Sequence, residues 1–407
     1  MPNRRAFFHA GTAAAVGALL PTLRLDAAPS LRVNGFELVA VRASSRTVWL
    51  FVRVRTDAGL VGVGEASDAF GFANTTAADA ARMKAELRGF FDLVDGKSPL
   101  DIGDYRRRGE PAARKGGLVS ATAFSAIEQA LWDLSGKALG VPVYALFGGK
   151  LRDTLPVYAN INRATTKRTP DGFAATARAA VKEGFRAIKG APWDGFPPAG
   201  SPASAIEAAV ENGIACAAAM RDAVGSGVDV MVDCHSFFDV ALAERVAARL
   251  EPLNLAWYEE PVAPERIEDT REIRRRIRQQ MAAGEVLFGV SGFAPLSRDR
   301  TVNVIMPDVK HCGGLLELTH IAAAAEQDGV DVAPHNPSGP VSTAASAHVC
   351  AVLKNFRILE LQWGEVDWRS DVVDPPERFE GGTFTMSSRP GFGIELNDRV
   401  IRSKPSA

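Results

Sequence analysis

The most constraining feature of the sequence is a series of ionisable residues that recurs every 23 to 27 positions through its C-terminal half. Each member ends or follows a short apolar run, and a stretch with helical character fills each interval. The members are Asp233, Glu259, Glu285, Asp308, His335 and Glu360. Successive parallel strands need a crossover of a dozen or more residues, usually a helix. One interval therefore corresponds to one strand and one helix.

The same rhythm begins before Asp233, in the apolar segments 155–161 and 185–190, which brings the number of predicted strands to eight. The interval between Glu285 and Thr301 is short and leaves little room for a helix. The other intervals predict helices at 171–183, 203–224, 239–251, 264–279, 314–328 and 341–353. We therefore predict an α/β protein with a (β/α)8 barrel of the TIM type over residues 155–363. All strand C-termini of such a barrel open onto one face, where the site is built.

The segments on either side of the barrel lack this rhythm. Residues 31–154 predict an α+β domain, with an antiparallel meander at 36–41, 47–56 and 61–65 and helices at 76–92 and 118–138. Residues 364–407 are rich in glycine and proline, and we expect them to return and pack on the first domain.

Residues 1–30 predict an export signal rather than part of the fold. Arg4 and Arg5 precede an apolar stretch at 10–20, and small residues follow. Paired arginines favour the twin-arginine route, which implies a bacterial periplasmic protein, or a cytoplasmic one if the signal is not functional. The four cysteines of the barrel are too few for a disulfide framework in a chain of 407 residues, so we expect them to be reduced and buried.

Three consecutive barrel strands of the series end in carboxylates: Asp233, Glu259 and Glu285. Like charges that converge on a small volume are unfavourable unless a cation neutralises them. Oxygen ligands select a hard ion, with Mg2+ the first choice and Mn2+ a substitute. We predict that these three residues bind a metal ion. The formal net charge of −1 gives no hint of a nucleic-acid or membrane-surface partner.

Six short motifs accompany this series in a fixed order. They are Gly-Val-Gly-Glu at 62–65, Ala-Leu-Trp-Asp-Leu-Ser-Gly-Lys at 130–137, Leu-Phe-Gly-Gly-Lys at 146–150, Tyr-Glu-Glu-Pro at 258–261, Pro-Asp-Val-Lys-His-Cys-Gly-Gly at 307–314 and Pro-His-Asn-Pro at 334–337. Together they resemble the enolase superfamily over about residues 31–400, specifically its mandelate racemase/muconate lactonizing enzyme branch. The resemblance implies a capping domain on a barrel, completed by the C-terminal segment, and assembly into a homo-oligomer. It also favours Glu259 over Glu260 as the ligand.

The chemistry implied by the resemblance is abstraction of the proton α to a carboxylate, with Mg2+ binding that carboxylate. His335 would be the base and Asp308 would orient its imidazole. Glu360 would donate to or polarise the substrate carboxylate, for which it must be protonated. Racemases of this subgroup carry Lys-x-Lys on the second strand, but this chain has Lys189-Gly-Ala. Lys189 can neutralise the substrate carboxylate, while the usual second base is missing.

His235 stands two residues after Asp233 and should reach the same face if the strand continues. Asp-x-His at this position resembles the acid-sugar dehydratases of the superfamily, in which the histidine is a general acid. The sequence therefore predicts a Mg2+-dependent dehydratase that converts a sugar acid to a 2-keto-3-deoxy acid. The loops at 67–74 and 191–204 are candidates to read its hydroxyls. A racemase or epimerase with His235 as second base is the alternative, and an exported sugar-acid-binding protein without catalysis is a more distant one.

Overall fold

The computed structural model describes residues 31–71 and 75–405, so the predicted export signal lies outside the described residues. The described part begins with three antiparallel strands, β1 (Val33–Arg42), β2 (Val48–Thr56) and β3 (Val61–Glu65). Four helices follow: α1 (Ala77–Phe91), α2 (Ile102–Lys115), α3 (Gly117–Leu139) and α4 (Val143–Leu146). The sequence did not predict α2, because its apolar stripe is narrow and Pro111 lies inside it. These elements form the capping domain.

The Gly-Val-Gly-Glu motif of β3 is explained by its contact with α3. A Cβ at Gly62 would lie 2.2 Å from the carbonyl oxygen of Ala130, and one at Gly64 would lie 2.1 Å from that of Ala126. Only glycine therefore lets the strand lie directly on the helix. Asp133 of α3 completes the joint, because its side chain accepts a hydrogen bond from the backbone N–H of Val63 at 2.9 Å.

The predicted eight-stranded barrel is confirmed. The first seven parallel strands are hydrogen-bonded to their neighbours in chain order, and the eighth pairs with the first. A bridge between Val332 and Phe356 joins the seventh strand to the segment before the eighth. The strands are β4 (Thr154–Asn160), β5 (Ala187–Gly190), β6 (Asp229–Asp233), β7 (Trp257–Glu259), β8 (Met281–Ala283), β9 (Val304–Ile305), β10 (Asp331–Val332) and β11 (Leu359–Gln362).

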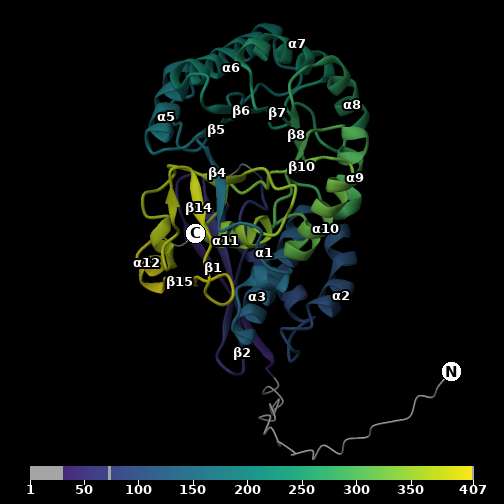
Figure 1. Cartoon of the computed structure of the whole chain (residues 1–407), viewed down its shortest axis with the longest axis vertical. Coiled ribbons are helices and arrows are strands. Elements are labelled where there is room, and N and C mark those ends of the chain that lie inside the picture. Colours follow the sequence, from purple (N-terminus) through teal and green to yellow (C-terminus); the bar gives the residue numbers. More distant parts are fainter. Residues whose placement is uncertain (1–30, 72–74, 406–407) are drawn as a thin grey trace, which may run out of the picture.

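Seven helices surround these strands, and Figure 1 shows α5 to α8 as an outer arc around them. They are α5 (Pro170–Lys182), α6 (Ala203–Val224), α7 (Val240–Leu250), α8 (Ile267–Arg276), α9 (Gly289–Ser297), α10 (Gly314–Gln327) and α11 (Pro340–Cys350), with short 3-10 turns at Glu251–Leu253 and Arg298–Arg300. Helix α9 corrects the expectation for the short interval after Glu285. Its nine residues suffice to bury Phe293 and Leu296 against the barrel.

The capping domain is joined to the barrel by carboxylates that lie at helix N-termini. Glu65 accepts hydrogen bonds from the backbone N–H groups of Gly339 (2.7 Å) and Ser342 (2.8 Å) at the start of α11. Glu128 of α3 accepts from Leu315 (2.8 Å) and Leu316 (3.2 Å) at the start of α10. Free N–H groups and the helix dipole both favour a negative charge there. The two domains thus meet through matched charges as well as apolar packing.

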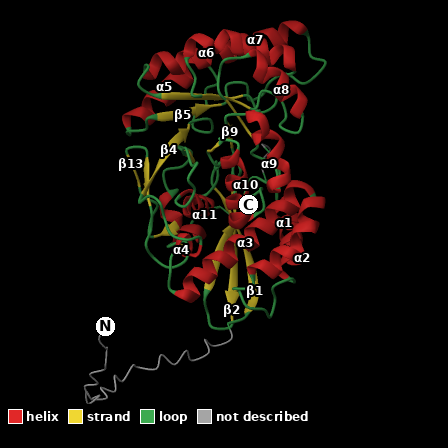
Figure 2. Ribbon diagram, turned by 45° about the vertical axis from the view of Figure 1, so that its right-hand side comes forward, coloured by secondary structure: helices red, strands yellow, loops and turns green. Residues whose placement is uncertain are grey.

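The C-terminal segment runs along both domains, as the yellow ribbon of Figure 1 and the turned view of Figure 2 show. It contains η3 (Ser370–Val372), β12 (Val373–Asp374), β13 (Phe379–Glu380), β14 (Thr383–Thr385), β15 (Glu395–Leu396) and α12 (Asp398–Arg402). Strand β14 pairs antiparallel with β4, which the sequence did not suggest. Further on, the N–H of Phe392 donates to Asp133 at 2.7 Å, and Glu395 pairs with Lys137 at 2.6 Å.

Two smaller expectations concern the cysteines and membranes. Cys216, Cys234, Cys312 and Cys350 are free and buried, as predicted. Within residues 31–71 and 75–405, none of the helices combines the length and the apolar character needed to cross a bilayer.

Candidate active site

A cavity of about 270 Å³ lies at the C-terminal ends of the barrel strands. The barrel contributes Asp233, Glu285, His235 and His335 to its lining, and the capping domain contributes Arg46 and Asp68. Parallel barrel strands present their C-terminal ends to a common face, which is why residues far apart in sequence meet here. Asp233 and Glu259 end β6 and β7. The other members of the series do not end a strand. Glu285, Asp308 and His335 come two or three residues after β8, β9 and β10, and Glu360 lies within β11.

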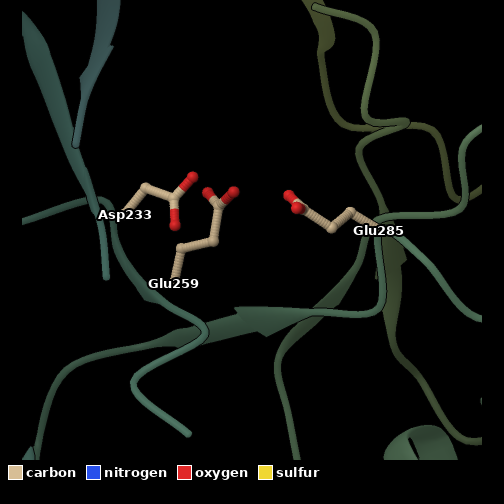
Figure 3. A group of neighbouring side chains, drawn as sticks. All are labelled: Asp233, Glu259 and Glu285. Carbon is tan, nitrogen blue, oxygen red and sulfur yellow. The ribbon is translucent and has the colours of Figure 1, made fainter. Parts of the chain in front are cut away.

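Asp233, Glu259 and Glu285 point toward one another (Figure 3). One carboxylate oxygen from each lies within 4.8 Å of the others, and all three residues are buried. Burial raises the pKa of Glu259 well above its usual value, and the charges of Asp233, Glu360 and Glu285 raise it further. Buried carboxylates that repel one another are the donor set of a hard divalent cation. The residues present therefore fit a metal ion.

Glu260 has a different place, as expected from the sequence. Its backbone is left-handed (φ 37°), and its side chain accepts hydrogen bonds from the N–H groups of Gly284 (2.7 Å) and Glu285 (3.3 Å). Burial and the neighbouring charge of Glu285 raise its pKa to about 8. Glu260 thus supports the backbone that carries the third carboxylate of the triad.

Lys189 lies under the carboxylate triad, where it is buried. Its Nζ is 2.5 Å from Glu259, 3.2 Å from Glu360 and 3.7 Å from Asp233. Burial lowers the pKa of Lys189, but these carboxylates outweigh burial and raise the pKa well above its usual value. The sequence predicts that Lys189 neutralises the substrate carboxylate. In this structure its ammonium group is instead paired with carboxylates of the protein. Ala191, also buried, stands where the second lysine of a Lys-x-Lys pair would be.

His335 and Asp308 form the expected pair. His335 Nδ1 lies 2.8 Å from Asp308 Oδ2, and its Nε2 lies 3.2 Å from Glu285 Oε2. Lys310 holds Asp308 in turn, with its Nζ at 2.5 Å and its N–H at 2.7 Å from the carboxylate. Burial raises the pKa of Asp308, but Lys310 and His311 hold it far below its usual value. Burial also opposes the charge of His335, and Glu285, Glu360 and Asp308 nevertheless raise its pKa.

His235 reaches the cavity, although not for the reason that the sequence suggested. Strand β6 ends at Asp233, and His235 and Ser236 have left-handed backbones with φ of 44° and 60°. A turn, not strand alternation, therefore brings the imidazole back toward the triad. Its Nε2 lies 3.1 Å from Asp233 Oδ2, and its N–H donates to Asp233 Oδ1 at 2.9 Å.

Asp194 is the site residue that sequence reasoning missed. It lies in the loop after β5, and its Oδ1 is 2.6 Å from His235 Nδ1. Burial disfavours the charged imidazole of His235, but Asp233 and Asp194 raise its pKa well above the usual value. The site therefore contains two imidazole–carboxylate pairs, one against Glu285 and one against Asp233. Asp194 falls inside the predicted loop 191–204, but no motif marks it as a histidine partner.

Glu360, predicted to donate to or polarise the substrate carboxylate, is held by hydrogen-bond donors in this structure. Its oxygens accept hydrogen bonds from Asn160 Nδ2 at 2.6 Å and from the N–H of Asn336 at 2.8 Å. Burial raises the pKa of Glu360, but Lys189, His335 and these donors lower it below its usual value. These partners favour the ionised form of Glu360. A proton-donating role requires Lys189 to withdraw or a second negative charge to approach.

Comparison with known proteins places this geometry in a family. Residues 31–148 match the mandelate racemase/muconate lactonizing enzyme N-terminal domain, and residues 172–400 match the enolase C-terminal domain-like model. A D-xylonate dehydratase of Haloferax volcanii is 33% identical over 86% of this chain and 83% of its own length. A D-galactonate dehydratase of Verminephrobacter eiseniae is 31% identical over 87% of this chain and 90% of its own length.

A solved structure agrees with these sequence matches. The crystal structure of a mandelate racemase/muconate lactonizing enzyme from a Sulfitobacter species superposes with a TM-score of 0.82. It covers 93% of this chain and 96% of its own, at 28% identity. Both domains and their order are thus accounted for by one family. The chain belongs to the mandelate racemase/muconate lactonizing enzyme family of the enolase superfamily, and it is an enzyme.

Proposed function

We propose that the enzyme removes water from a sugar acid to give a 2-keto-3-deoxy acid in a Mg2+-dependent reaction. The observation that carries this proposal is the pair of imidazole–carboxylate groups beside the triad, His335 with Asp308 and His235 with Asp194. Elimination of water needs one group that takes a proton and one that gives a proton. The names of the relatives point the same way, since both are dehydratases of sugar acids.

Asp233, Glu259 and Glu285 would hold Mg2+, the ion used in this superfamily. The bound ion supplies Lewis-acid stabilisation of the charge that develops on the substrate carboxylate. His335 Nε2 would take the proton from the carbon next to that carboxylate. Asp308 holds the opposite ring nitrogen, which fixes the tautomer and stabilises the imidazolium that forms. Lys310 keeps Asp308 ionised for this task.

His235 would give its proton to the β-hydroxyl, the C–O bond would break, and water would leave. Asp194 holds Nδ1 of His235 during this step. The resulting enol takes a proton at the β-carbon and loses its hydroxyl proton, which gives the keto acid. Lys189 and Glu360 would bind the substrate carboxylate after exchanging their present ion pair with each other for contacts to the substrate.

A racemase or epimerase is the second candidate, and the symmetry of the site favours it. His235 is as well supported by a carboxylate as His335 is, so it could act as a second base on the opposite face of the substrate carbon. The two functions share the first step and differ in the fate of the hydroxyl group.

The test is incubation of the purified enzyme with a panel of sugar mono- and diacids in D2O, with Mg2+ and with a chelator. We expect keto acid only with Mg2+, and its formation should fall more than a hundredfold in His335→Asn. In His235→Asn, deuterium exchange at the α-carbon should persist while keto acid disappears. His320→Asn, on the exposed face of α10, serves as matched control. Exchange with inverted configuration and no keto acid would favour the epimerase instead.

A further inference from the structure

The loop between β1 and β2 carries an arginine of the capping domain into the cavity. Arg46 lines the cavity, and 44% of its side chain is exposed. Its guanidinium lies 3.5 Å from Asp194 Oδ2, which is at the outer limit of a hydrogen bond. Within residues 31–71 and 75–405, Asp194 is the one carboxylate within 4 Å of the Arg46 guanidinium, and the hydrogen bond to it comes from Nη2 alone.

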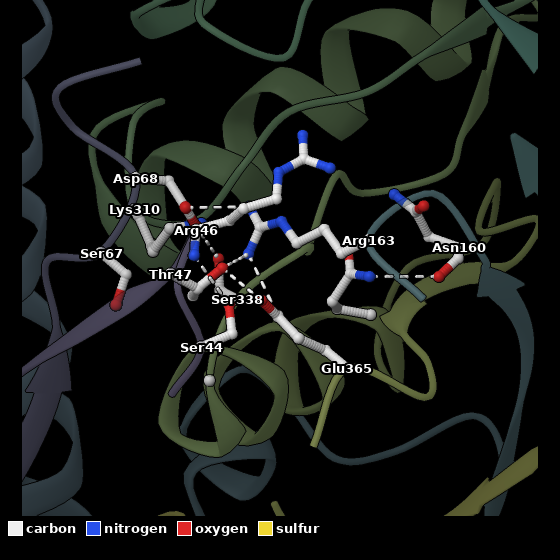
Figure 4. A network of polar contacts seen from close by, with 12 residues as sticks. Ser44, Arg46, Thr47, Ser67, Asp68, Asn160, Arg163, Lys310, Ser338 and Glu365 are labelled. Carbon is white, nitrogen blue, oxygen red and sulfur yellow. Dashed lines mark hydrogen bonds and ion pairs between the residues drawn. The ribbon is translucent and has the colours of Figure 1, made fainter. Parts of the chain in front are cut away.

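The described lining of the cavity includes one other arginine, Arg163, and this residue is held firmly. It lies 3.0 Å from Asp68, 3.1 Å from Thr47 Oγ1 and 3.5 Å from Glu365. Only 16% of its side chain is exposed. Figure 4 shows this network, with the guanidinium of Arg46 lying apart from it. Arg163 thus ties the capping domain to the barrel, whereas Arg46 faces the open volume.

The charge of Asp194 does not neutralise Arg46, because several groups share it. Asp194 holds His235 at 2.6 Å and Asn162 Nδ2 at 2.8 Å, and Arg168 lies 3.7 Å away. Burial raises the pKa of Asp194, but these partners, His235 first, lower it. Arg46 and Arg168 both lie within 4 Å of Asp194 Oδ2, so two guanidinium groups share one carboxylate where Arg46 enters the cavity.

We propose that Arg46 binds a second carboxylate at the far end of the substrate, so that the preferred substrates are sugar diacids rather than sugar monoacids. The planar guanidinium fork matches a carboxylate through two parallel hydrogen bonds. One carboxylate and one imidazole, those of Asp194 and His235, stand between Arg46 and the triad. The inference rests on the proposed function, because it assumes that the first carboxylate lies at the triad.

The experiment compares D-gluconate with D-glucarate, and D-galactonate with D-galactarate, in the full-length enzyme with Mg2+. Each pair differs only in the oxidation state of the terminal carbon. For the pair that the enzyme turns over, we expect kcat/KM to be at least tenfold higher for the diacid than for the monoacid. Arg46→Met should reduce this diacid-to-monoacid ratio at least tenfold, chiefly by raising KM for the diacid. This ratio reports the contact between Arg46 and the distal carboxylate. Any effect of the substitution on Asp194 and His235 would change kcat/KM for the monoacid and the diacid alike. Arg46→Lys should keep part of the preference, and Arg107→Met, on α2, should keep all of it.

A binding measurement separates failure of this inference from failure of the proposed function. Titration calorimetry of both acids on Mg2+-loaded His335→Asn reports affinity without turnover, and the added Arg46→Met change should weaken diacid binding at least tenfold. Preference for the monoacid, or a ratio that Arg46→Met leaves unchanged, would overturn the inference. Absence of exchange and keto acid with every substrate, together with Arg46-dependent diacid binding, would overturn only the dehydratase. Stronger binding of a 6-phosphogluconate probe than of glucarate would overturn the carboxylate assignment.

Discussion

At the scale of single residues, the site is a set of buried charges that compensate one another. The series of ionisable residues predicted from spacing does meet at one face, because strand periodicity alone fixes that. Spacing could not predict the partners. Asp194 approaches His235 through a loop, and the backbone turn at His235 depends on local conformation that no residue type announces. The present ion pairs of Lys189 likewise depend on distances between strands.

Lys310 gives a prediction at this scale. It is fully buried and pairs with Asp308 at 2.5 Å. Burial lowers the pKa of Lys310, but Asp308, Asp68 and Glu65 together outweigh burial and raise it. Removing one partner of a buried pair leaves the other charge uncompensated, so Lys310→Met should lower the free energy of unfolding by about 3–5 kcal/mol. Urea denaturation measures this. Lys354→Met, whose side chain is 76% exposed, should change little, and equal losses in both variants would contradict the prediction.

At the scale of elements, apolar spacing in the sequence predicts some helices, while others form through packing that the sequence pattern does not show. The apolar spacing of α6 placed its ends correctly, at 203 and 224. Helix α2 was not predicted, because most of its surface is polar and it depends on packing against α3 rather than on an apolar pattern of its own. Helix α11 shows the reverse case, since it is buried all round and its period is weak. Its prediction came from the position of an interval, not from amphipathicity.

His348 of α11 supplies a prediction of pH dependence. It is buried, accepts the N–H of Tyr144 at 3.1 Å and lies between the rings of Tyr144 and Phe392. Burial lowers its pKa to about 4, below the usual value of about 6.5. The unfolded chain therefore binds the extra proton first, and stability present above pH 6.5 is lost as the pH falls toward 4. From pH 7 to pH 5 the loss from this group should be about 2 kcal/mol.

Unfolding free energies at pH 7 and pH 5 measure this contribution. His348→Leu should show a smaller decline between the two pH values than the unsubstituted enzyme. His320→Asn, on the exposed surface of α10, should show the full decline. An identical decline in the enzyme and in His348→Leu would mean that other groups account for the pH dependence.

At the scale of the whole molecule, three stretches of chain meet at the side chain of Asp133. It accepts hydrogen bonds from Val63 of the meander and Phe392 of the C-terminal segment, and it lies 2.8 Å from Lys137. The sequence predicted the two domains and the return of the C-terminal segment, because composition and rhythm change at 154 and 364. It could not predict that β14 would pair with the first barrel strand, since edge pairing leaves no periodic signal.

Asp133→Asn tests this meeting point. The amide keeps one acceptor oxygen but directs an NH2 group at the second backbone N–H. Hydrogen bonds to a charged group contribute about 1.5–3 kcal/mol, and we expect a loss of unfolding free energy in that range. Chymotrypsin should also cut faster after Phe392, which is buried in the intact contact and is released when the contact is lost. Asp153→Asn, whose side chain is 86% exposed, is the control, and unchanged cleavage in Asp133→Asn would contradict the role assigned to the contact.

The helix N-termini that receive Glu65 and Glu128 have a consequence for how this enzyme can diverge. The barrel side of the seam is made of main-chain N–H groups at 315, 316, 339 and 342. Every amino acid except proline supplies such a group. Leu315, Leu316 and Ser342 can therefore change their side chains while their N–H groups still bind the capping domain. Gly339 cannot, because a Cβ there would lie 2.9 Å from the carboxylate of Glu65, and the two glutamates cannot change either. Substitutions at these three helix positions can therefore accumulate without altering how the capping domain sits on the barrel.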